Sequence, residues 1–285
     1  MRTALLALAL LAACQRETPD DDVPRQALAL VQADELLGLA PDRARIVVDV
    51  RPVEAFAAGH IPGAVRLDVS RLRATVDGVP EQLAPKDTIE AALTELGVDL
   101  GDEIVVVDAT TSPPAGRLVW TLEHFGHAPE RLRVLDGGWP AWLAAGGPES
   151  TEPGQVDDGP APALGAEQPA LRVDAAWVLA HLDDPDVLLL DVRSDAEWQA
   201  GRIPGALHSP WQAAQTPDGT LLDPTALRDL YARALEAPTV AVYCKSGMRA
   251  SLTWLVLRLL GHPDVRLYDG SWNEWGARAD LPKET

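Results

Sequence analysis

The sequence predicts an α/β fold of two tandem domains, each a mostly parallel sheet flanked by helices. Three observations predict this class: the chain length, an internal repeat, and short apolar runs that alternate with helix-like segments. At roughly 150 residues per domain, the 285 residues correspond to about two domains. A composition of 47% hydrophobic and 24% charged residues is that of a folded globular protein.

The internal repeat is the most informative of these observations. Three motifs occur twice, in the same order along the chain: IVVDVR and LLLDVR at 46–51 and 188–193, GHIPGA and GRIPGA at 59–64 and 201–206, and VLDGGW and LYDGSW at 134–139 and 267–272. A stretch rich in Pro, Gly and acidic residues separates the two copies and is typical of a linker. We therefore expect duplicated domains at 26–146 and 171–285, joined by a linker at 147–170.

Strand-like and helix-like segments alternate within each copy. Six runs are apolar at nearly every position, as expected for strands covered on both faces: 46–50, 103–107, 131–135, 187–192, 239–243 and 265–268. Four segments between them carry apolar residues at helical spacing: 86–96, 116–125, 224–235 and 250–260. This alternation predicts a mostly parallel sheet in each domain.

Charge and cysteine content exclude several function classes. A formal net charge of −19 repels phosphate backbones, so we expect no nucleic-acid partner. Two cysteines, Cys14 and Cys244, are too few for a disulfide framework or a multi-cysteine metal site. The sequence has no phosphate-binding glycine loop and no clustered metal ligands, so no cofactor is expected.

The first residues predict an export signal. The chain begins with one positive charge, followed by an Ala- and Leu-rich run over residues 4–13 and then Cys14. This order is typical of a secretory signal, and the run is too short to span a bilayer. Residues 11–14 (LAAC) resemble the site at which bacterial lipoproteins are cleaved and lipidated. We expect a signal peptide over 1–13, a flexible tether over 14–25, and a periplasmic or cell-envelope protein anchored only by a lipid on Cys14.

Cys244 stands where a parallel sheet places its chemistry. It follows one predicted strand and precedes a predicted helix, and ligands bind at the carboxyl ends of such strands. The helix N-terminus offers free N–H groups and a dipole that favour an anion and lower the pKa of a nearby thiol. Lys245 and Arg249 add positive charge, and Gly247 permits a tight backbone turn around the sulfur. The pattern therefore predicts a nucleophilic thiolate.

These motifs together resemble the two-domain rhodanese family, sulfurtransferases of the thiosulfate and 3-mercaptopyruvate group. The resemblance covers about residues 26–285 and rests on both DVR strands, the GHIPGA turn, the loop 244–249 (CKSGMR) and the ending 268–275 (YDGSWNEW). In that family the first domain is inactive and has Asp in place of the cysteine. Asp108 takes that position here, so the resemblance implies two rhodanese-like domains, of which only the second is catalytic.

The resemblance also implies a reaction and its site residues. Cys244 would take the sulfane sulfur of a small-molecule donor such as thiosulfate, release sulfite, and pass the sulfur from a persulfide to cyanide or a thiol. Backbone N–H groups of residues 245–249 would stabilise the persulfide. The substrate-binding residues expected on this basis are Lys245, Ser246, Gly247, Met248, Arg249 and Arg193.

Three other interpretations remain open. Cysteine phosphatases also place Cys and Arg around an anion before a helix, but with five intervening residues, whereas four separate Cys244 from Arg249. A non-catalytic thiol or persulfide-binding module would fit the same loop. Among the sulfurtransferases, Lys245 favours thiosulfate and Ser246 matches the mercaptopyruvate enzymes; we expect thiosulfate as the donor.

Two positions near the second DVR motif have open roles. The family often has a substrate-binding Arg four residues after the Arg of this motif, where this chain has Glu197. That carboxylate would repel an anionic donor or pair with a neighbouring Arg, and Arg202 is a candidate for a substitute charge. Asp191 and Arg193 form either a structural ion pair or, through Arg193, a contact with substrate.

Overall fold

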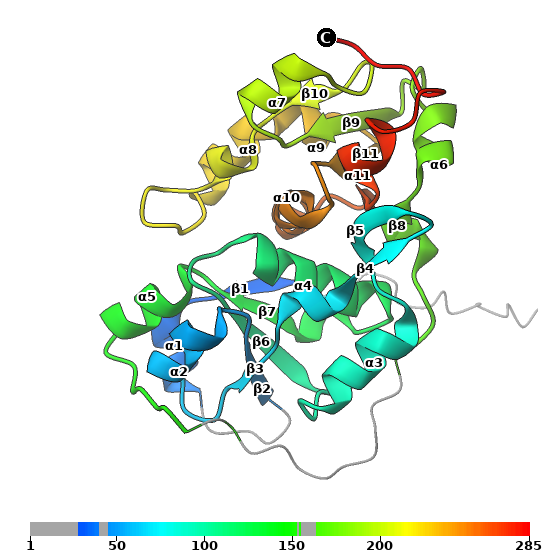
Figure 1. The fold of residues 1–285 in the computed structure, drawn as a ribbon. Helices are drawn as coiled ribbons and strands as arrows, with labels where there is room; N and C mark the ends of the chain where they lie inside the picture. Colours follow the sequence, from blue (N-terminus) through cyan, green and yellow to red (C-terminus); the bar gives the residue numbers. More distant parts are fainter. Residues whose placement is uncertain (1–27, 40–44, 153, 155–163) are drawn as a thin grey trace, which may run out of the picture.

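The structure, a computed structural model, describes residues 28–39, 45–152, 154 and 164–285. Two five-stranded sheets form the centres of two domains that follow one another along the chain (Figure 1). Strand pairs within both sheets are parallel throughout the described residues, so the α/β prediction is confirmed. The predicted signal peptide, the tether and Cys14 lie outside the described residues, as does the middle of the predicted linker.

The two sheets repeat one strand order. The first runs β1–β7–β6–β2–β3, and the second, taken from its first strand, runs β8–β12–β11–β9–β10. The strands of the first sheet are β1 (Ala29–Val31), β2 (Arg45–Asp49), β3 (Val65–Arg66), β6 (Glu103–Val107) and β7 (Leu132–Leu135). Those of the second are β8 (Arg172–Val173), β9 (Val187–Asp191), β10 (Leu207–His208), β11 (Thr239–Tyr243) and β12 (Val265–Tyr268). The sequence repeat therefore corresponds to a duplicated fold.

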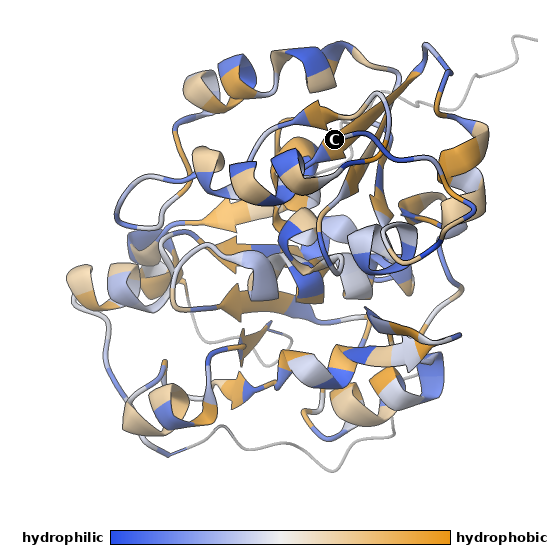
Figure 2. Ribbon diagram, turned by 45° about the horizontal axis from the view of Figure 1, so that its top comes forward, coloured by the Kyte–Doolittle hydropathy of each residue, from blue (hydrophilic) through white to orange (hydrophobic). Residues whose placement is uncertain are grey.

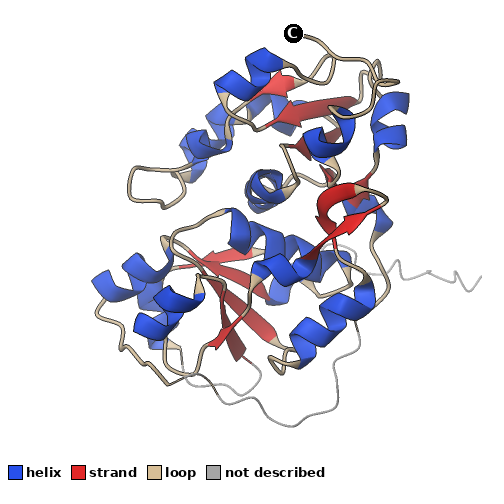
Figure 3. Cartoon of the chain, in the orientation of Figure 1, coloured by secondary structure: helices blue, strands red, loops and turns tan. Residues whose placement is uncertain are grey.

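Helices cover both faces of each sheet (Figure 3). In the first domain they are α1 (Ala33–Gly38), α2 (Val53–Ala58), α3 (Lys86–Thr94), α4 (Pro113–His124) and α5 (Gly138–Ala144). In the second they are α6 (Ala175–Ala180), α7 (Asp195–Ala200), α8 (Pro224–Leu230), α9 (Ala232–Glu236), α10 (Met248–Leu259) and α11 (Ser271–Trp275). A hairpin of β4 (Arg73–Val76) and β5 (Val79–Leu83) projects from the first domain toward the second (Figure 1).

The central elements agree with the sequence prediction. Each of the six predicted strands is present with bounds that differ by at most one residue, and Figure 2 shows strands of the sheets largely in orange, the colour of hydrophobic residues. One predicted helix is wrong: residues 224–235 form two helices. The chain leaves helical geometry at Tyr231 (φ −103°, ψ 18°), whose ring is buried.

The two domains share one apolar core. The largest cluster of buried side chains takes residues from both sheets and from the helices between them, while smaller clusters lie on the outer face of each sheet. Helices α4 and α10 lie side by side at the centre of the molecule (Figure 1). Gly116 permits their close contact, because a Cβ there would lie 2.8 Å from backbone atoms of Ser251 and Leu252. The loops that precede α4 and α10 are thus placed at a common seam.

Candidate active site

Cys244 lies at the carboxyl end of β11, directly before the loop that begins α10. Strand β11 pairs with β9 up to Tyr243 and Asp191, so the ends of both strands meet at this edge of the sheet. The cysteine is free and fully buried, with 0% of its surface exposed. The structure therefore gives Cys244 the strand-end position that the sequence predicts, inside the protein and not on its surface.

Ser271 holds the backbone of the Cys244 loop through three hydrogen bonds. Its Oγ accepts hydrogen bonds from the N–H of Cys244 (3.2 Å) and of Gly247 (3.0 Å), and donates to the carbonyl of Tyr268 (2.8 Å). Ser271 has φ +50°, a left-handed conformation that costs energy for a residue with a side chain. Ser271 was not among the residues predicted from the sequence, although the repeated Asp-Gly-x-Trp motif marks its position.

Gly247 is required by both backbone conformation and space. Its φ of +75° lies in the left-handed region, as the expected tight turn demands. A Cβ at this position would lie 2.8 Å from Asp269 Oδ1 and 3.1 Å from Arg117 Nη1. The loop can pass this buried ion pair only with glycine.

Four backbone N–H groups at the start of α10 lack a hydrogen-bond acceptor among the described residues. Within the described part of the chain, the amides of Lys245, Ser246, Met248 and Arg249 have no protein acceptor. The expectation that residues 245–249 all offer an N–H to the sulfur is wrong at Gly247, because its N–H is bound to Ser271 Oγ. An anion at the helix N-terminus would meet four donors and the positive end of the helix dipole.

The two cations of the loop differ in their surroundings. Lys245 is exposed, and no acidic partner faces it among the described residues. Arg249 forms a two-pronged ion pair with Glu197, at 2.7 Å from Nη1 to Oε2 and 2.8 Å from Nη2 to Oε1. This carboxylate raises the pKa of Arg249, and the Cys244 sulfur adds to the effect through charge and a hydrogen bond. The Arg249 guanidinium thus lies next to both the thiol and Glu197.

Glu197 pairs with a neighbouring Arg, one of the two roles considered from the sequence. The hydrogen bonds from Arg249 lower the pKa of Glu197 to about 2. Glu197 also closes a capping box at the start of α7, where its carboxylate accepts from Ser194 Oγ at 2.8 Å. The carboxylate is therefore held in place from two sides. Arg202 supplies no substitute charge to the loop, because it pairs with Glu284 near the chain end.

Arg193 lies behind the loop, inside the domain. Its guanidinium forms a two-pronged pair with Asp191, the shortest contact 2.6 Å, and donates to the carbonyl of Gly201. Only 1% of the residue is exposed. Asp49 and Arg51 form the same pair in the first domain. This geometry favours the structural role over the substrate contact that we expected for Arg193.

The first domain reaches the loop through Arg117 of α4. Its Nη1 donates to Asp269 Oδ1 at 2.6 Å, and both side chains are completely buried. Asp269 also accepts from the N–H of Leu83 (2.6 Å) at the end of the hairpin. The remaining nitrogens of Arg117, Nε and Nη2, have no protein partner within the described chain. This pair leaves no local signal in the sequence, since its members are 152 residues apart.

Asp108 occupies the equivalent place in the first domain. It follows β6, and its carbonyl accepts from Trp139 N–H at 2.8 Å, as the carbonyl of Cys244 accepts from Trp272 at 3.0 Å. The carboxylate accepts hydrogen bonds from Ser112 Oγ and from the Ala109 N–H, and burial raises its pKa. The first-domain loop therefore holds a buried carboxyl group where the second holds a thiol.

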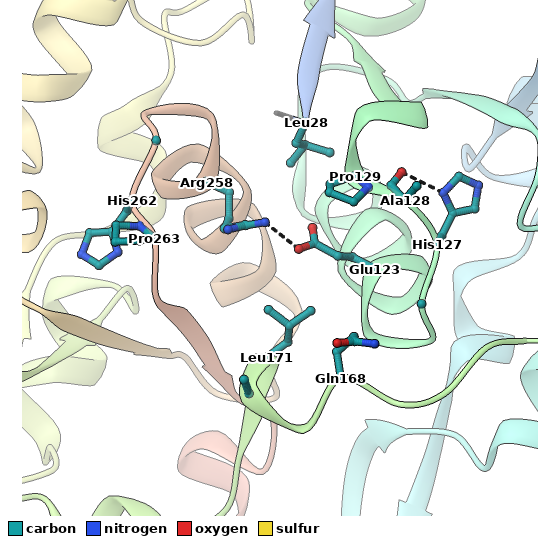
Figure 4. A pocket seen from close by; sticks show the side chains of 13 residues that line it. Leu28, Glu123, His127, Ala128, Pro129, Gln168, Leu171, Arg258, His262 and Pro263 are labelled. Carbon is teal, nitrogen blue, oxygen red and sulfur yellow. Dashed lines mark hydrogen bonds and ion pairs between the residues drawn. The ribbon is translucent and has the colours of Figure 1, made fainter. Parts of the chain in front are cut away.

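A separate cavity lies at the far ends of the two central helices. It has a volume of about 670 Å³ and is crossed by the ion pair of Arg258 and Glu123, 2.7 Å long (Figure 4). Leu28 and Leu171 lie on either side of this pair (Figure 4). Cys244 precedes the N-terminus of α10, so this cavity is at the opposite end of the helix.

The described part of the chain offers neither a metal site nor a membrane span. No group of three or more His, Cys, Asp or Glu side chains there is arranged to hold a metal ion. None of the helices in the described ranges has the length and apolar character needed to cross a membrane.

Comparisons with known proteins agree with the repeat. A model of the rhodanese-like domain matches residues 32–145 and again residues 174–278. The chain is 32% identical over 249 residues to a thiosulfate sulfurtransferase of Azotobacter vinelandii, with 84% of this chain and 90% of that protein covered. It is 32% identical over 256 residues to a 3-mercaptopyruvate sulfurtransferase of Escherichia coli K12, with 83% and 87% covered.

Solved structures with the same fold include enzymes of ergothioneine chemistry. An EanB variant with a cysteine persulfide, in a tetrahedral intermediate state with ergothioneine, has a TM-score of 0.80 at 25% identity, covering 92% of this chain and 71% of that one. The anaerobic ergothioneine biosynthesis enzyme of Chlorobium limicola has a TM-score of 0.78 at 26% identity, covering 90% and 70%. With two matched domains and relatives similar over most of their length, the chain belongs to the rhodanese family.

Proposed function

We propose that this protein is a sulfurtransferase that moves the sulfane sulfur of thiosulfate to a thiophilic acceptor through a persulfide on Cys244. One observation carries the proposal: a free thiol lies at the carboxyl end of β11, before a helix start with four open N–H groups. Relatives named thiosulfate sulfurtransferase support the reaction class. A related structure that carries a cysteine persulfide supports the intermediate.

The first half-reaction forms the persulfide. The Cys244 thiolate attacks the outer sulfur of thiosulfate, a new S–S bond forms, and the original S–S bond breaks. Sulfite leaves with the electron pair of that bond. The open N–H groups of Lys245 and Ser246 and those of the first α10 turn stabilise the negative charge on the bound sulfur. The exposed ammonium of Lys245 attracts the anionic donor against the acidic charge of the whole chain.

The second half-reaction removes the sulfur. A nucleophilic acceptor, cyanide or a thiol, attacks the outer sulfur of the persulfide, and the Cys244 thiolate is the leaving group. The enzyme returns to its starting state without an external oxidant or reductant. Because Cys244 has no exposed surface, both reactants reach the sulfur only when side chains of the loop move aside.

The direct test is the replacement of the thiol. We expect Cys244→Ser to abolish thiosulfate-dependent sulfur transfer to cyanide and to abolish the one-sulfur mass gain after thiosulfate treatment. Cys14→Ser is the matched control, because it removes the only other cysteine of the sequence. Cys14→Ser is expected to keep both properties. Turnover at the unmodified rate by Cys244→Ser would refute the mechanism.

Mercaptopyruvate is the second candidate donor. A relative named 3-mercaptopyruvate sulfurtransferase is as similar to this chain as one named thiosulfate sulfurtransferase. Lys245, whose ammonium lacks an acidic partner in the described chain, favours the doubly charged thiosulfate. We therefore expect the higher kcat/KM with thiosulfate, and a strong preference for mercaptopyruvate would overturn this choice. Loss of turnover with both donors, while the persulfide still forms, would instead favour a sulfur-binding module.

We also propose that the protein is exported and anchored by a lipid on Cys14. The proposal rests on the order of charge, apolar run and LAAC motif in the sequence. We expect Cys14→Ser to leave the protein without an acyl group and to move it from the detergent phase to the aqueous phase. Unchanged partitioning of this variant would contradict the proposal.

A further inference from the structure

Glu197 binds Arg249, the charged residue at the end of the Cys244 loop. Both Nη atoms of Arg249 donate to the Glu197 carboxylate, at 2.7 Å and 2.8 Å. The Cys244 sulfur lies close enough to this guanidinium to contribute, after Glu197, to the raised pKa of Arg249. A planar guanidinium binds a carboxylate and an inorganic oxyanion through the same pair of donors. An oxyanion beside Cys244 therefore meets a site that Glu197 already fills.

The Glu197 carboxylate is held in one position and is negatively charged at neutral pH, because its pKa is lowered to about 2. Ser194 donates to Glu197 Oε2 from its hydroxyl (2.8 Å) and its backbone N–H (3.2 Å), as part of the cap of α7. About a quarter of the Arg249 side chain and a third of the Glu197 side chain are exposed (25% and 31%), so an incoming anion has access to the pair. The pair is a preformed part of the site and is reachable from solvent.

We propose that Glu197 is a specificity-determining residue, which competes with the oxyanion of the sulfur donor for Arg249. The inference rests on the proposed function, because it concerns donors of sulfur to Cys244. A donor whose sulfane sulfur is attached to an oxyanion, such as thiosulfate, must displace Glu197 to use the guanidinium. An organic persulfide without an oxyanion has no need of Arg249 and avoids this cost. Glu197 therefore shifts selectivity toward organic persulfides that carry no oxyanion group.

The two donor classes react in the same way at sulfur. The Cys244 thiolate attacks the outer sulfur of R–S–SH, the S–S bond of the donor breaks, and the thiolate R–S⁻ leaves with the electron pair. The reaction yields the same persulfide on Cys244 as thiosulfate does. A difference between the donors thus reports on binding beside the sulfur, not on the group that is transferred.

The test uses a near-isosteric substitution with a matched control. Glu197→Gln removes the negative charge and can keep the cap of α7, because Gln also closes a capping box. Asp195→Asn removes one charge from the same helix turn, but Asp195 is 80% exposed and does not contact Arg249. We expect Glu197→Gln to lower the KM for thiosulfate about fivefold or more, consistent with the usual strength of charge-assisted hydrogen bonds. Its kcat, and all constants for 2-hydroxyethyl persulfide, should change less than about twofold.

Asp195→Asn should leave the constants for both donors unchanged. An unchanged or raised KM for thiosulfate in Glu197→Gln would overturn the inference, and so would an equal gain in Asp195→Asn. Thiosulfate binding by calorimetry in a Cys244→Ser background separates this inference from the proposed function. Tighter binding after Glu197→Gln in that background supports the competition even if the unsubstituted protein shows no turnover.

Discussion

The loop that holds Cys244 is shaped by side chains far from it in sequence. Ser271 Oγ accepts hydrogen bonds from the N–H groups of Cys244 and Gly247, and Glu197 holds Arg249 at the end of the loop. The cysteine, the glycine and the arginine can be predicted from the sequence, because a strand end, a turn and a helix start leave local signals. For Glu197 the sequence left open whether it pairs with a neighbouring Arg, and it did not indicate a role for Ser271, since only the folded chain decides which side chains reach the loop.

Glu197 makes part of the free energy of unfolding dependent on pH. Arg249 lowers the pKa of this carboxyl to about 2 in the folded protein, against 4.5 for the free side chain. A carboxyl group whose pKa is lowered by folding stabilises the folded protein fully when the pH is above its pKa in the unfolded chain. This stabilisation is lost as the pH falls from that value toward the pKa of the group in the folded protein. For a partly exposed pair we expect a contribution of about 1 kcal/mol or less.

Urea unfolding of Glu197→Gln measures this contribution. We expect the variant to be less stable than the unsubstituted protein near neutral pH, and the difference to shrink as the pH falls below about 4.5. Asp195→Asn serves again as the control for loss of charge on α7. A difference that stays constant between neutral pH and about pH 3.5 would contradict the shifted pKa.

At the scale of elements, the contact of α4 with α10 joins the two domains. The contact is close because Gly116 has no side chain where the backbone of Ser251 and Leu252 passes. Arg117 and Ser251 add polar contacts across the same seam: Arg117 binds Asp269, and Ser251 Oγ donates to the carbonyl of Pro113 at 3.2 Å. The position of the Cys244 loop against the first domain depends on this helix pair.

Gly116→Ala tests the close approach. The added methyl group would lie 2.8 Å from backbone atoms, which cannot move without separating the helices. We expect a loss of about 1–3 kcal/mol in the free energy of unfolding, as for other overpacked sites. Gly38→Ala in α1 is the control, because its Cβ would meet nothing within 4 Å. Equal stability of the two variants would show that the helices tolerate a wider spacing.

Element by element, the sequence predicts the long central strands and misses the short ones. Strands β2, β6, β9 and β11 have five apolar-rich residues and are visible as uninterrupted runs. Strands β3, β8 and β10 have two residues each, too few for any periodic signal. They pair at the sheet edges because neighbouring strands offer free backbone groups, which is a property of the tertiary structure. The break at Tyr231 is likewise set by burial of one ring in the shared core.

At the scale of the molecule, each domain inserts a segment against the Asp-Gly turn of the other. The N–H of Leu83 in the first domain donates to Asp269 of the second at 2.6 Å. The N–H of Leu221 in the second donates to Asp136 of the first at 3.2 Å. The internal repeat thus produces reciprocal contacts, related by an approximate two-fold exchange of the domains. They differ at the carboxylate, because Asp269 also binds a completely buried cation, Arg117, and Asp136 forms no ion pair among the described residues.

This difference predicts unequal effects of the same substitution at the two turns. Asp136→Ala would leave the Leu221 N–H and the Thr111 hydroxyl without their acceptor, at a cost of about 1–3 kcal/mol. Asp269→Ala would leave the buried charge of Arg117 without its ion-pair partner, and breaking a buried ion pair costs about 3–5 kcal/mol of stability. Asp269 also forms an ion pair with Arg172, 3.4 Å long, which adds to the loss. Urea unfolding of both variants compares the turns within one chain.

Adding Arg117→Met should restore part of the stability lost in Asp269→Ala, because it removes the unpaired charge. Equal losses at the two turns, or no recovery in the double variant, would mean that the buried pair does not contribute to joining the domains.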